Sequence, residues 1–198
     1  MPQTLPKLYF IRHGETDWNA EGRLQGQRDI PLNDVGRVQA EETGAILARL
    51  DARYEDLAYW ASPLSRTRET MEILRARLGL HPPAYRTDDR LMEVSFGDWE
   101  GLTWPQVEAR SPRVAEARIA DKWHVSPPGG ENYEAVAERL GAFMTLLERP
   151  SVVVAHGGVG RALMALTASM SREKAAEVFV RQGVVYVFDG PRFTVETP

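Results

Sequence analysis

Hydrophobic residues along the chain form short apolar runs that alternate with longer segments of helical period. The short runs are rich in branched and aromatic residues, which favour β-strands, and they lie at residues 8–11, 57–61, 151–155, 184–188 and 193–195. The longer segments repeat apolar residues every three or four positions, as amphipathic helices do, at residues 32–50, 63–78, 131–147 and 158–168. This alternation predicts an α/β domain with a largely parallel sheet.

Local signals refine where these elements begin and end. Asn33 is a plausible N-cap for the first long helix, and Ser62 followed by Pro63 predicts the start of the second. Thr103 and Gln106 have the spacing of a capping box, which predicts a further short helix. The turn-forming residues 189–192 separate the last two strands, so we expect an antiparallel hairpin at one edge of the sheet.

Residues 97–130 differ in character from the rest of the chain. Their periodicity is weaker, and they contain Trp99, Trp104, Trp123 and His124 before the turn at residues 127–130. We interpret this stretch as a lid or lobe inserted into a single domain that spans residues 1–198. Its tryptophans are expected to serve packing more than substrate binding.

Composition narrows the chemistry. The 198 residues suffice for one self-sufficient core. The absence of cysteine excludes disulfides, a thiolate nucleophile and cysteine-based metal sites. A net charge of −4 argues against a partner such as nucleic acid or an anionic membrane, because both are bound through basic surfaces.

The chain also shows no signal-peptide core and no apolar run of about 18 residues. We therefore expect a cytoplasmic protein. Its oligomeric state stays open, with a homodimer as one form.

Two histidines stand in matching contexts. His13 follows the strand-like run at 8–11 and Arg12, and His156 follows the run at 151–155; a glycine comes after each histidine. If both strands are parallel, both imidazoles emerge at the edge of the sheet where open α/β sheets bind ligands. The glycines would let backbone N–H groups approach an anion, and the second glycine opens a helix whose N-terminus favours negative charge.

Other site types are not supported by the sequence. It holds no HxH or HExxH spacing, so we expect no metal site. It also lacks the glycine-rich dinucleotide and P-loop patterns, and we expect no cofactor.

The residues around His13 resemble the signature of a known family. The run Arg12-His13-Gly14-Glu15-Thr16-Asp17-Trp18-Asn19 is similar to that of the histidine phosphatase superfamily, the phosphoglycerate-mutase-like proteins of branch 1. Further motifs follow in family order at residues 22–26, 31–33, 62–67, 91–93, 96–101, 128–131 and 155–158. The expected fold is a three-layer α/β/α sandwich with a mostly parallel central sheet, one antiparallel edge strand and a small inserted lobe.

The resemblance implies a role for each residue of the site. His13 would be the nucleophile that takes the phosphoryl group, while Arg12, Arg66 and His156 would surround the phosphoryl oxygens and stabilise their charge. Flanking guanidinium groups should also keep the imidazole neutral. By the same resemblance, secondary phosphate contacts would come from Asn19, Gln25, Gly26 and Gly157.

Glu93 is the candidate general acid and base by its position in the family motif. It would protonate the leaving alkoxide and then, once ionised, activate the water that hydrolyses phosphohistidine. Glu15 and Glu100 are its rivals, and we interpret both as structural residues of their loops.

We favour a phosphomonoesterase for a small phosphorylated metabolite. The family's mutases grip a substrate carboxylate with extra basic residues and have Asn where this chain has Gly158. This chain lacks those basic residues after Glu93, although Arg110, Arg113 and Arg118 of the lobe could partly substitute. The alternatives are a cofactor-dependent phosphoglycerate mutase and a non-catalytic phosphate-binding module.

Overall fold

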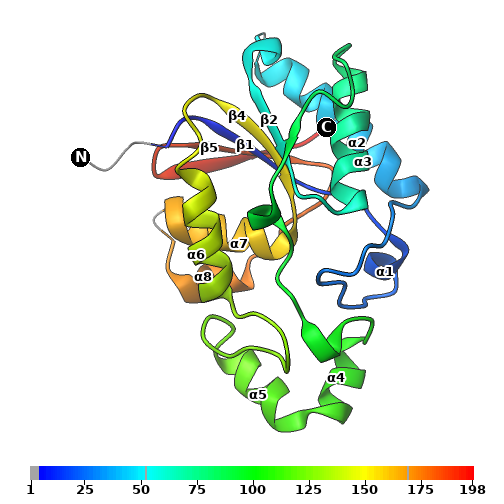
Figure 1. Cartoon of the computed structure of the whole chain (residues 1–198), viewed down its shortest axis with the longest axis vertical. Helices are drawn as coiled ribbons and strands as arrows, with labels where there is room; N and C mark the ends of the chain where they lie inside the picture. The colour runs from blue at the N-terminus through cyan, green and yellow to red at the C-terminus, as the bar shows by residue number, and fades with distance from the viewer. Residues whose placement is uncertain (1–4, 52, 169) are drawn as a thin grey trace.

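The computed structural model describes residues 5–51, 53–168 and 170–198, and its centre is a mixed sheet (Figure 1). Within this part of the chain the strand order is β3-β2-β4-β1-β5-β6. The strands are β1 (Leu8–Arg12), β2 (Ala58–Ala61), β3 (Arg86–Thr87), β4 (Ser151–Ala155), β5 (Val185–Asp189) and β6 (Arg192–Glu196). β3, β2, β4 and β1 pair in parallel, whereas β5 is antiparallel to both β1 and β6. The predicted C-terminal hairpin is therefore confirmed.

The central strands are apolar on both faces, as strands covered by helices on both sides must be. Every residue of β4 is buried. Along β1 the side chains alternate: Phe10 joins one buried cluster, and its neighbours Tyr9 and Ile11 join another on the opposite face.

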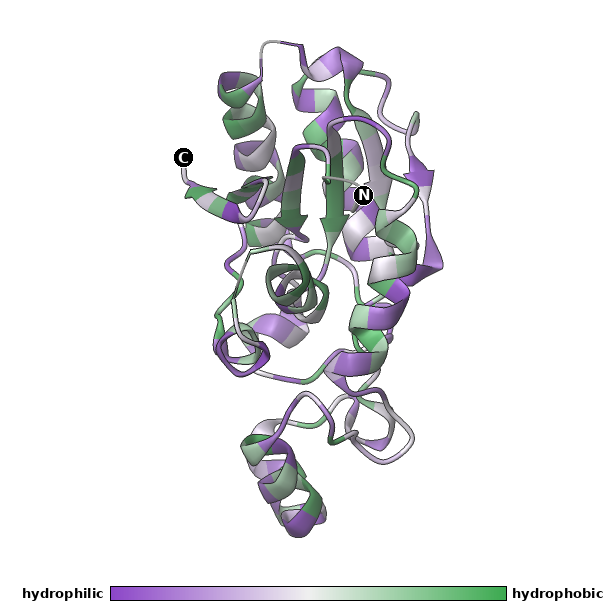
Figure 2. Cartoon of the chain, turned by 90° about the vertical axis from the view of Figure 1, so that its left-hand side faces the viewer, coloured by the Kyte–Doolittle hydropathy of each residue, from purple (hydrophilic) through white to green (hydrophobic). Residues whose placement is uncertain are grey.

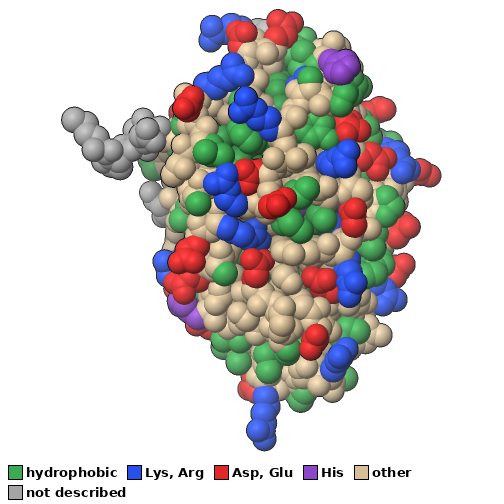
Figure 3. Space-filling model, in the orientation of Figure 1, with side chains coloured by type: hydrophobic (Ala, Val, Ile, Leu, Met, Phe, Trp, Pro, Cys, Tyr) green, Lys and Arg blue, Asp and Glu red, His purple; other side chains and the backbone are tan. Residues whose placement is uncertain are grey.

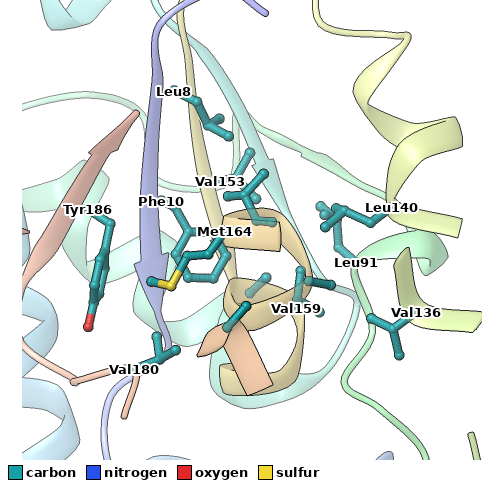
Figure 4. Close-up of a cluster of buried hydrophobic side chains, with 14 of the residues drawn as sticks. Leu8, Phe10, Leu91, Val136, Leu140, Val153, Val159, Met164, Val180 and Tyr186 are labelled. Carbon is teal, nitrogen blue, oxygen red and sulfur yellow. The ribbon is translucent and has the colours of Figure 1, made fainter. Parts of the chain in front are cut away.

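Helices cover both faces of the sheet and give the expected three layers. The helices α2 (Asp34–Leu50) and α3 (Ser65–Arg77) lie on one face. On the other face lie α6 (Tyr133–Met144), α7 (Gly157–Thr167) and α8 (Arg172–Glu177). Figure 4 shows the core on this second face, where Val159 and Met164 of α7 pack against Phe10 of β1. Burial of each such side chain contributes roughly 1.5–3 kcal/mol.

Of the caps predicted for the two long helices α2 and α3, one is confirmed. Asn33 caps α2 by accepting a hydrogen bond from the Gly36 N–H at 2.9 Å. The Ser62 prediction was wrong, because α3 begins at Ser65 with Leu64 in the capping position. Ser62 instead turns the chain after β2, and its hydroxyl lies against the ring of His156.

Several short elements carry too little pattern to be predicted. β3 is two residues long and both are exposed, and the helix α1 (Asp17–Ala20) has four residues, none of them buried. α8 was not predicted either. The 3₁₀ turns at Tyr54–Asp56, Asp89–Leu91 and Gly97–Trp99 complete the described elements.

Residues 97–130 form two short helices, α4 (Trp104–Arg110) and α5 (Pro112–Ala120). They lie at the end of the molecule toward which the central strands point (Figures 1 and 2). The predicted capping box of Thr103 and Gln106 is present at the start of α4, and in it the Thr103 N–H donates to Gln106 Oε1 at 2.9 Å. A small buried cluster built on Trp99 and Val107 holds these helices. Trp123 is also buried and packs against Tyr133, so both tryptophans serve packing.

Acidic and basic side chains are interspersed over the face shown in Figure 3, with no large region of one sign. Among the described residues, no helix combines the length and the apolar character that crossing a bilayer would require.

Candidate active site

β1 and β4 bring the two histidines together. Arg12 pairs with Ala155 in the parallel ladder, and the His13 N–H donates to the Ala155 carbonyl at 3.0 Å. The next residue on each strand is then a histidine at the same sheet edge. The ring centroids of His13 and His156 lie 5.2 Å apart in an edge-to-face arrangement.

His13 is held in one tautomer. Its Nδ1 lies 2.7 Å from the carbonyl oxygen of Gly14, which can only accept, so Nδ1 carries the proton and Nε2 keeps its lone pair. The side chain is buried. Burial lowers the pKa of His13 well below 6.5, and the charges of Arg66 and Arg12 lower it further. His13 therefore presents a neutral nitrogen lone pair at neutral pH.

Two arginines flank this imidazole. Arg12 ends β1, and its Nη1 donates to the Val180 carbonyl at 2.9 Å. Arg66, in the first turn of α3, is fully buried and donates to the carbonyls of Arg28 at 2.7 Å and Gly26 at 2.8 Å. Burial lowers the pKa of Arg66 to about 10, so its guanidinium stays charged at neutral pH.

His156 immediately precedes α7, and its ring is held by Ser62, the residue that follows β2. Its Nε2 lies 2.8 Å from Ser62 Oγ, and that hydroxyl also accepts from the Leu64 N–H at 3.5 Å. In the arrangement in which this hydroxyl donates to Nε2, the proton of neutral His156 is on Nδ1. Burial, followed by the charge of Arg66, lowers the pKa of His156 well below 6.5.

Unpaired buried polar atoms gather in this region. Arg12 Nε, Arg66 Nε and His156 Nδ1 are all buried without a hydrogen-bond partner among the described residues, and so is Gln25 Oε1. Buried polar atoms are nearly always paired in folded proteins. Three N–H donors left unpaired around one imidazole fit an anion such as a phosphoryl group.

Glu93 follows the 3₁₀ turn Asp89–Leu91 and reaches the start of α7. Its Oε1 accepts from the Gly158 and Val94 N–H groups, each at 2.9 Å. A Cβ atom added at Gly158 would lie 2.4 Å from Glu93 Oε1 and 2.9 Å from a methyl of Val94. Glycine at position 158 therefore makes room for this placement of the carboxylate.

A cavity of about 190 Å³ joins these groups. Of the residues singled out in the sequence, it is lined by Arg12, His13, Asn19, Gln25, Gly26, Arg66, Glu93 and Gly157. His156 is fully buried, packs edge to face against the ring of His13 and is not part of the lining.

The rival carboxylates lie elsewhere. Glu15 accepts from Asn33 Nδ2 at 3.0 Å, and Glu100 accepts from the Gln27 N–H at 3.0 Å. Neither lines the cavity, so both brace their loops.

The lobe arginines do not reach the cavity. Arg110 and Arg113 are exposed. Arg118 is buried, donates to the Val125 carbonyl and lies over the rings of Phe96 and Tyr133. None of the three is placed to replace the carboxylate-binding residues of a mutase.

Five further residues line the cavity: Arg23, Leu24 and Phe96, which stand inside the family motifs but were not assigned to the site, and Arg161 and Phe179, which sequence reasoning missed altogether. Arg161 donates to Tyr133 Oη at 2.9 Å and to the Val178 carbonyl at 2.8 Å. Its position four residues after Gly157 places both on one face of α7, a signal that could have identified it. Phe179 lies between α8 and β5 and carries no such signal.

A larger groove of about 760 Å³ runs along β2, lined by residues such as Tyr59, Arg75 and Arg86. It contains neither histidine and no unpaired buried polar atom. The smaller cavity is therefore the candidate active site. The described residues hold no group of three His, Cys, Asp or Glu side chains placed to bind a metal.

Comparison with known proteins identifies the family of the chain. The sequence pattern of the histidine phosphatase superfamily (branch 1) matches residues 8–194. The chain belongs to this superfamily. It is 32% identical to phosphoglycerate mutase-like protein 4 of Arabidopsis thaliana over 96% of its own length and 83% of that protein.

A phosphatase of the superfamily is similar both in sequence and in structure. Identity to glucosyl-3-phosphoglycerate phosphatase of Mycobacterium tuberculosis is 36%, over 80% of this chain and 74% of that protein. The mycobacterial glucosyl-3-phosphoglycerate phosphatase structure with VO3 superposes with a TM-score of 0.79 at 33% identity, over 97% of this chain and 98% of that one. Relatives named as mutase-like and as phosphatase thus both match most of this chain.

The two neutral buried histidines predict how the stability of this superfamily member depends on pH. Below a pH of about 6.5 the unfolded chain takes up protons at His13 and His156, whereas the folded chain does not until much lower pH. Their contribution to the free energy of unfolding is complete above this pH and decreases as the pH falls. Each histidine should account for a slope of about 1.4 kcal/mol per pH unit in that window.

Urea unfolding measures this slope at several pH values below about 6.5, the usual pKa of histidine in an unfolded chain. His156→Asn should reduce the slope by about one histidine's share. An equal slope in the variant and the parent protein would show that His156 is protonated in the folded state.

Proposed function

We propose that the protein hydrolyses a small phosphomonoester through a phosphohistidine on Nε2 of His13. The observation that carries this proposal is the hydrogen bond from His13 Nδ1 to the Gly14 carbonyl, which leaves a neutral lone pair on Nε2 of a residue that lines the same cavity as Arg12 and Arg66 and their unpaired Nε donors. A neutral ring nitrogen is a competent nucleophile, and phosphoryl transfer depends mainly on positioning and on charge stabilisation.

The first step forms the bond from Nε2 to phosphorus and breaks the bond from phosphorus to the ester oxygen. The electron pair of the broken bond stays on the leaving oxygen, which takes the proton of Glu93. Arg12 and Arg66, which line the cavity, would stabilise the charge on the phosphoryl oxygens as the group passes between the two atoms, while His156 packs against the ring of His13.

The second step returns the enzyme to its starting state. Water attacks phosphorus and gives a proton to the Glu93 carboxylate, while the bond between phosphorus and Nε2 breaks and its electron pair returns to the imidazole. Inorganic phosphate leaves, His13 is neutral and Glu93 is protonated again. No metal or cofactor enters either step.

A phosphatase is favoured over a mutase by the surroundings of Glu93. Glycine at position 158 leaves room for the carboxylate, and the arginines of the lobe lie outside the cavity. Phosphoglycerate mutase stays the second candidate, because Arg161 lines the cavity and could hold a carboxylate.

An assay of both reactions distinguishes the two candidates. The protein, with EDTA present, is incubated with a panel of small phosphorylated metabolites, and phosphate release is measured beside interconversion of 2- and 3-phosphoglycerate with a bisphosphate primer. We expect phosphate release from at least one metabolite to be the faster reaction. Interconversion that is much faster than any phosphate release would identify a mutase instead.

Glu93→Gln should affect substrates unequally, because glutamine cannot donate or accept the catalytic proton. Release of an alkyl alcohol should slow by about 10²–10⁴-fold. p-Nitrophenyl phosphate needs no proton on its leaving group, so an initial burst of p-nitrophenol should survive and be followed by slow turnover.

Stopped-flow absorbance measures the burst, and Glu100→Gln is the matched carboxylate control outside the cavity. Equal slowing of both substrates, with no burst, would exclude Glu93 as the proton donor.

A further inference from the structure

Phe179 stands out on the surface beside the active site. Its residue is 74% exposed, the largest value among the exposed large hydrophobic residues of the described chain. It nevertheless lines the same cavity as His13 and Arg12. An apolar side chain kept in water at the mouth of a polar site is the kind of feature that marks a ligand contact.

The backbone on both sides of Phe179 is fixed by arginines of the cavity. The Val178 carbonyl accepts from Arg161 Nε at 2.8 Å, and the Val180 carbonyl accepts from Arg12 Nη1 at 2.9 Å. The Phe179 backbone is therefore tied directly to the residue that flanks the nucleophile.

Side chains reinforce this arrangement. Val180 belongs to the buried cluster of Figure 4 and is only 1% exposed, and Val178 packs against the same cluster. Val180 is buried and Val178 is partly buried against this cluster, whereas Phe179 between them is exposed, so its side chain points outward. Two residues after Val180, Gln182 Nε2 donates to Asn19 Oδ1 at 3.1 Å. This bond ties the segment to a second residue of the cavity lining.

The cavity lining combines charged and apolar side chains. The charged ones are Arg12, Arg23, Arg66, Glu93 and Arg161, and the apolar ones are Leu24, Phe96 and Phe179. A phosphoryl group placed on His13 would be held by the arginines that flank this imidazole, which leaves the apolar side chains to contact the leaving group.

We propose that Phe179 determines specificity by packing against the leaving group, and that the preferred substrates are phosphomonoesters whose leaving group carries a flat ring. This inference rests on the proposed function for the direction in which the substrate lies. Because its backbone is held in place, Phe179 offers its ring at little ordering cost. Packing of two rings favours a ring-bearing substrate over a short alkyl one.

The test measures hydrolysis of 1-naphthyl phosphate and ethyl phosphate by the parent protein, Phe179→Ala and Phe179→Tyr. Phe179→Ala should lower kcat/KM for the naphthyl ester about tenfold and change kcat/KM for the ethyl ester less than twofold. Phe179→Tyr should retain both values. Leu166→Ala, which removes an exposed apolar side chain of α7 outside the cavity, is the matched control.

Binding of non-hydrolysable analogues separates this inference from the reaction. Calorimetry should show that 1-naphthylmethylphosphonate binds more tightly than methylphosphonate, and that Phe179→Ala removes this preference while methylphosphonate binds as before. If these results hold but neither ester is hydrolysed, the proposed reaction is wrong and the role of Phe179 stands. An unchanged preference in Phe179→Ala, or equal losses for both ligands, overturns the role of Phe179.

Discussion

Replacement of His13 by alanine should lower kcat/KM for phosphomonoester hydrolysis by about 10⁴-fold or more, because removal of a covalent nucleophile disables both steps. No other residue that lines the cavity offers an equivalent lone pair. His156 is close, but its Nε2 is bonded to Ser62 and the residue does not line the cavity. It therefore cannot replace His13.

The folded state should tolerate this change, since it removes the ring without adding bulk. Circular dichroism and urea unfolding check that the variant is folded, and His81→Ala, at an exposed position, provides the matched control with full activity. Full turnover by a folded His13→Ala variant would show that the reaction does not pass through this residue.

Replacement of Arg66 by alanine should have a comparable effect for a different reason. Its guanidinium would stabilise charge on the transferring phosphoryl group, and loss of an arginine in that role typically costs about 10³–10⁵-fold in kcat. Its two Nη atoms donate to the carbonyls of Arg28 and Gly26, which fixes the third guanidinium nitrogen, Nε, in the site. Lysine has no such fork, so Arg66→Lys should recover little of the rate.

The pKa of His13 gives a second readout for Arg66. Burial is the main cause of its lowered pKa and the charge of Arg66 is the next, so Arg66→Ala should move the pKa of His13 upward toward 6.5. NMR titration of the imidazole measures this directly. A rate loss with no change in the pKa of His13 would mean that the guanidinium does not act on the nucleophile as described.

Much of the fold and the centre of the site could be predicted because both depend on strong local patterns. β1 and β4 are short apolar runs, and Arg12, His13 and His156 stand where those runs end. Parallel pairing then brings the two histidines together without any information about side chains. Arg66 was harder to place from pattern alone, and it was assigned through the family signature.

What could not be predicted depends on tertiary contacts. Ser62 resembles a helix cap in sequence, but the ring of His156 takes its hydroxyl and the helix begins three residues later. Phe179 has neither a motif nor a period, and its place at the cavity follows from hydrogen bonds that Arg12 and Arg161 make to its neighbours. Such contacts join segments that are far apart in the chain.

The most direct test of the central claim is to locate the phosphoryl group on the enzyme. Glu93→Gln is mixed with radiolabelled p-nitrophenyl phosphate, because the first step should proceed in this variant while the second is slow; the mixture is quenched in alkali and the label is mapped by mass spectrometry. We predict label on Nε2 of His13 that approaches one group per chain, is stable in base, is labile in acid and is absent from His13→Ala. Turnover of the parent protein with no label on His13, or with label on another residue, would contradict the account.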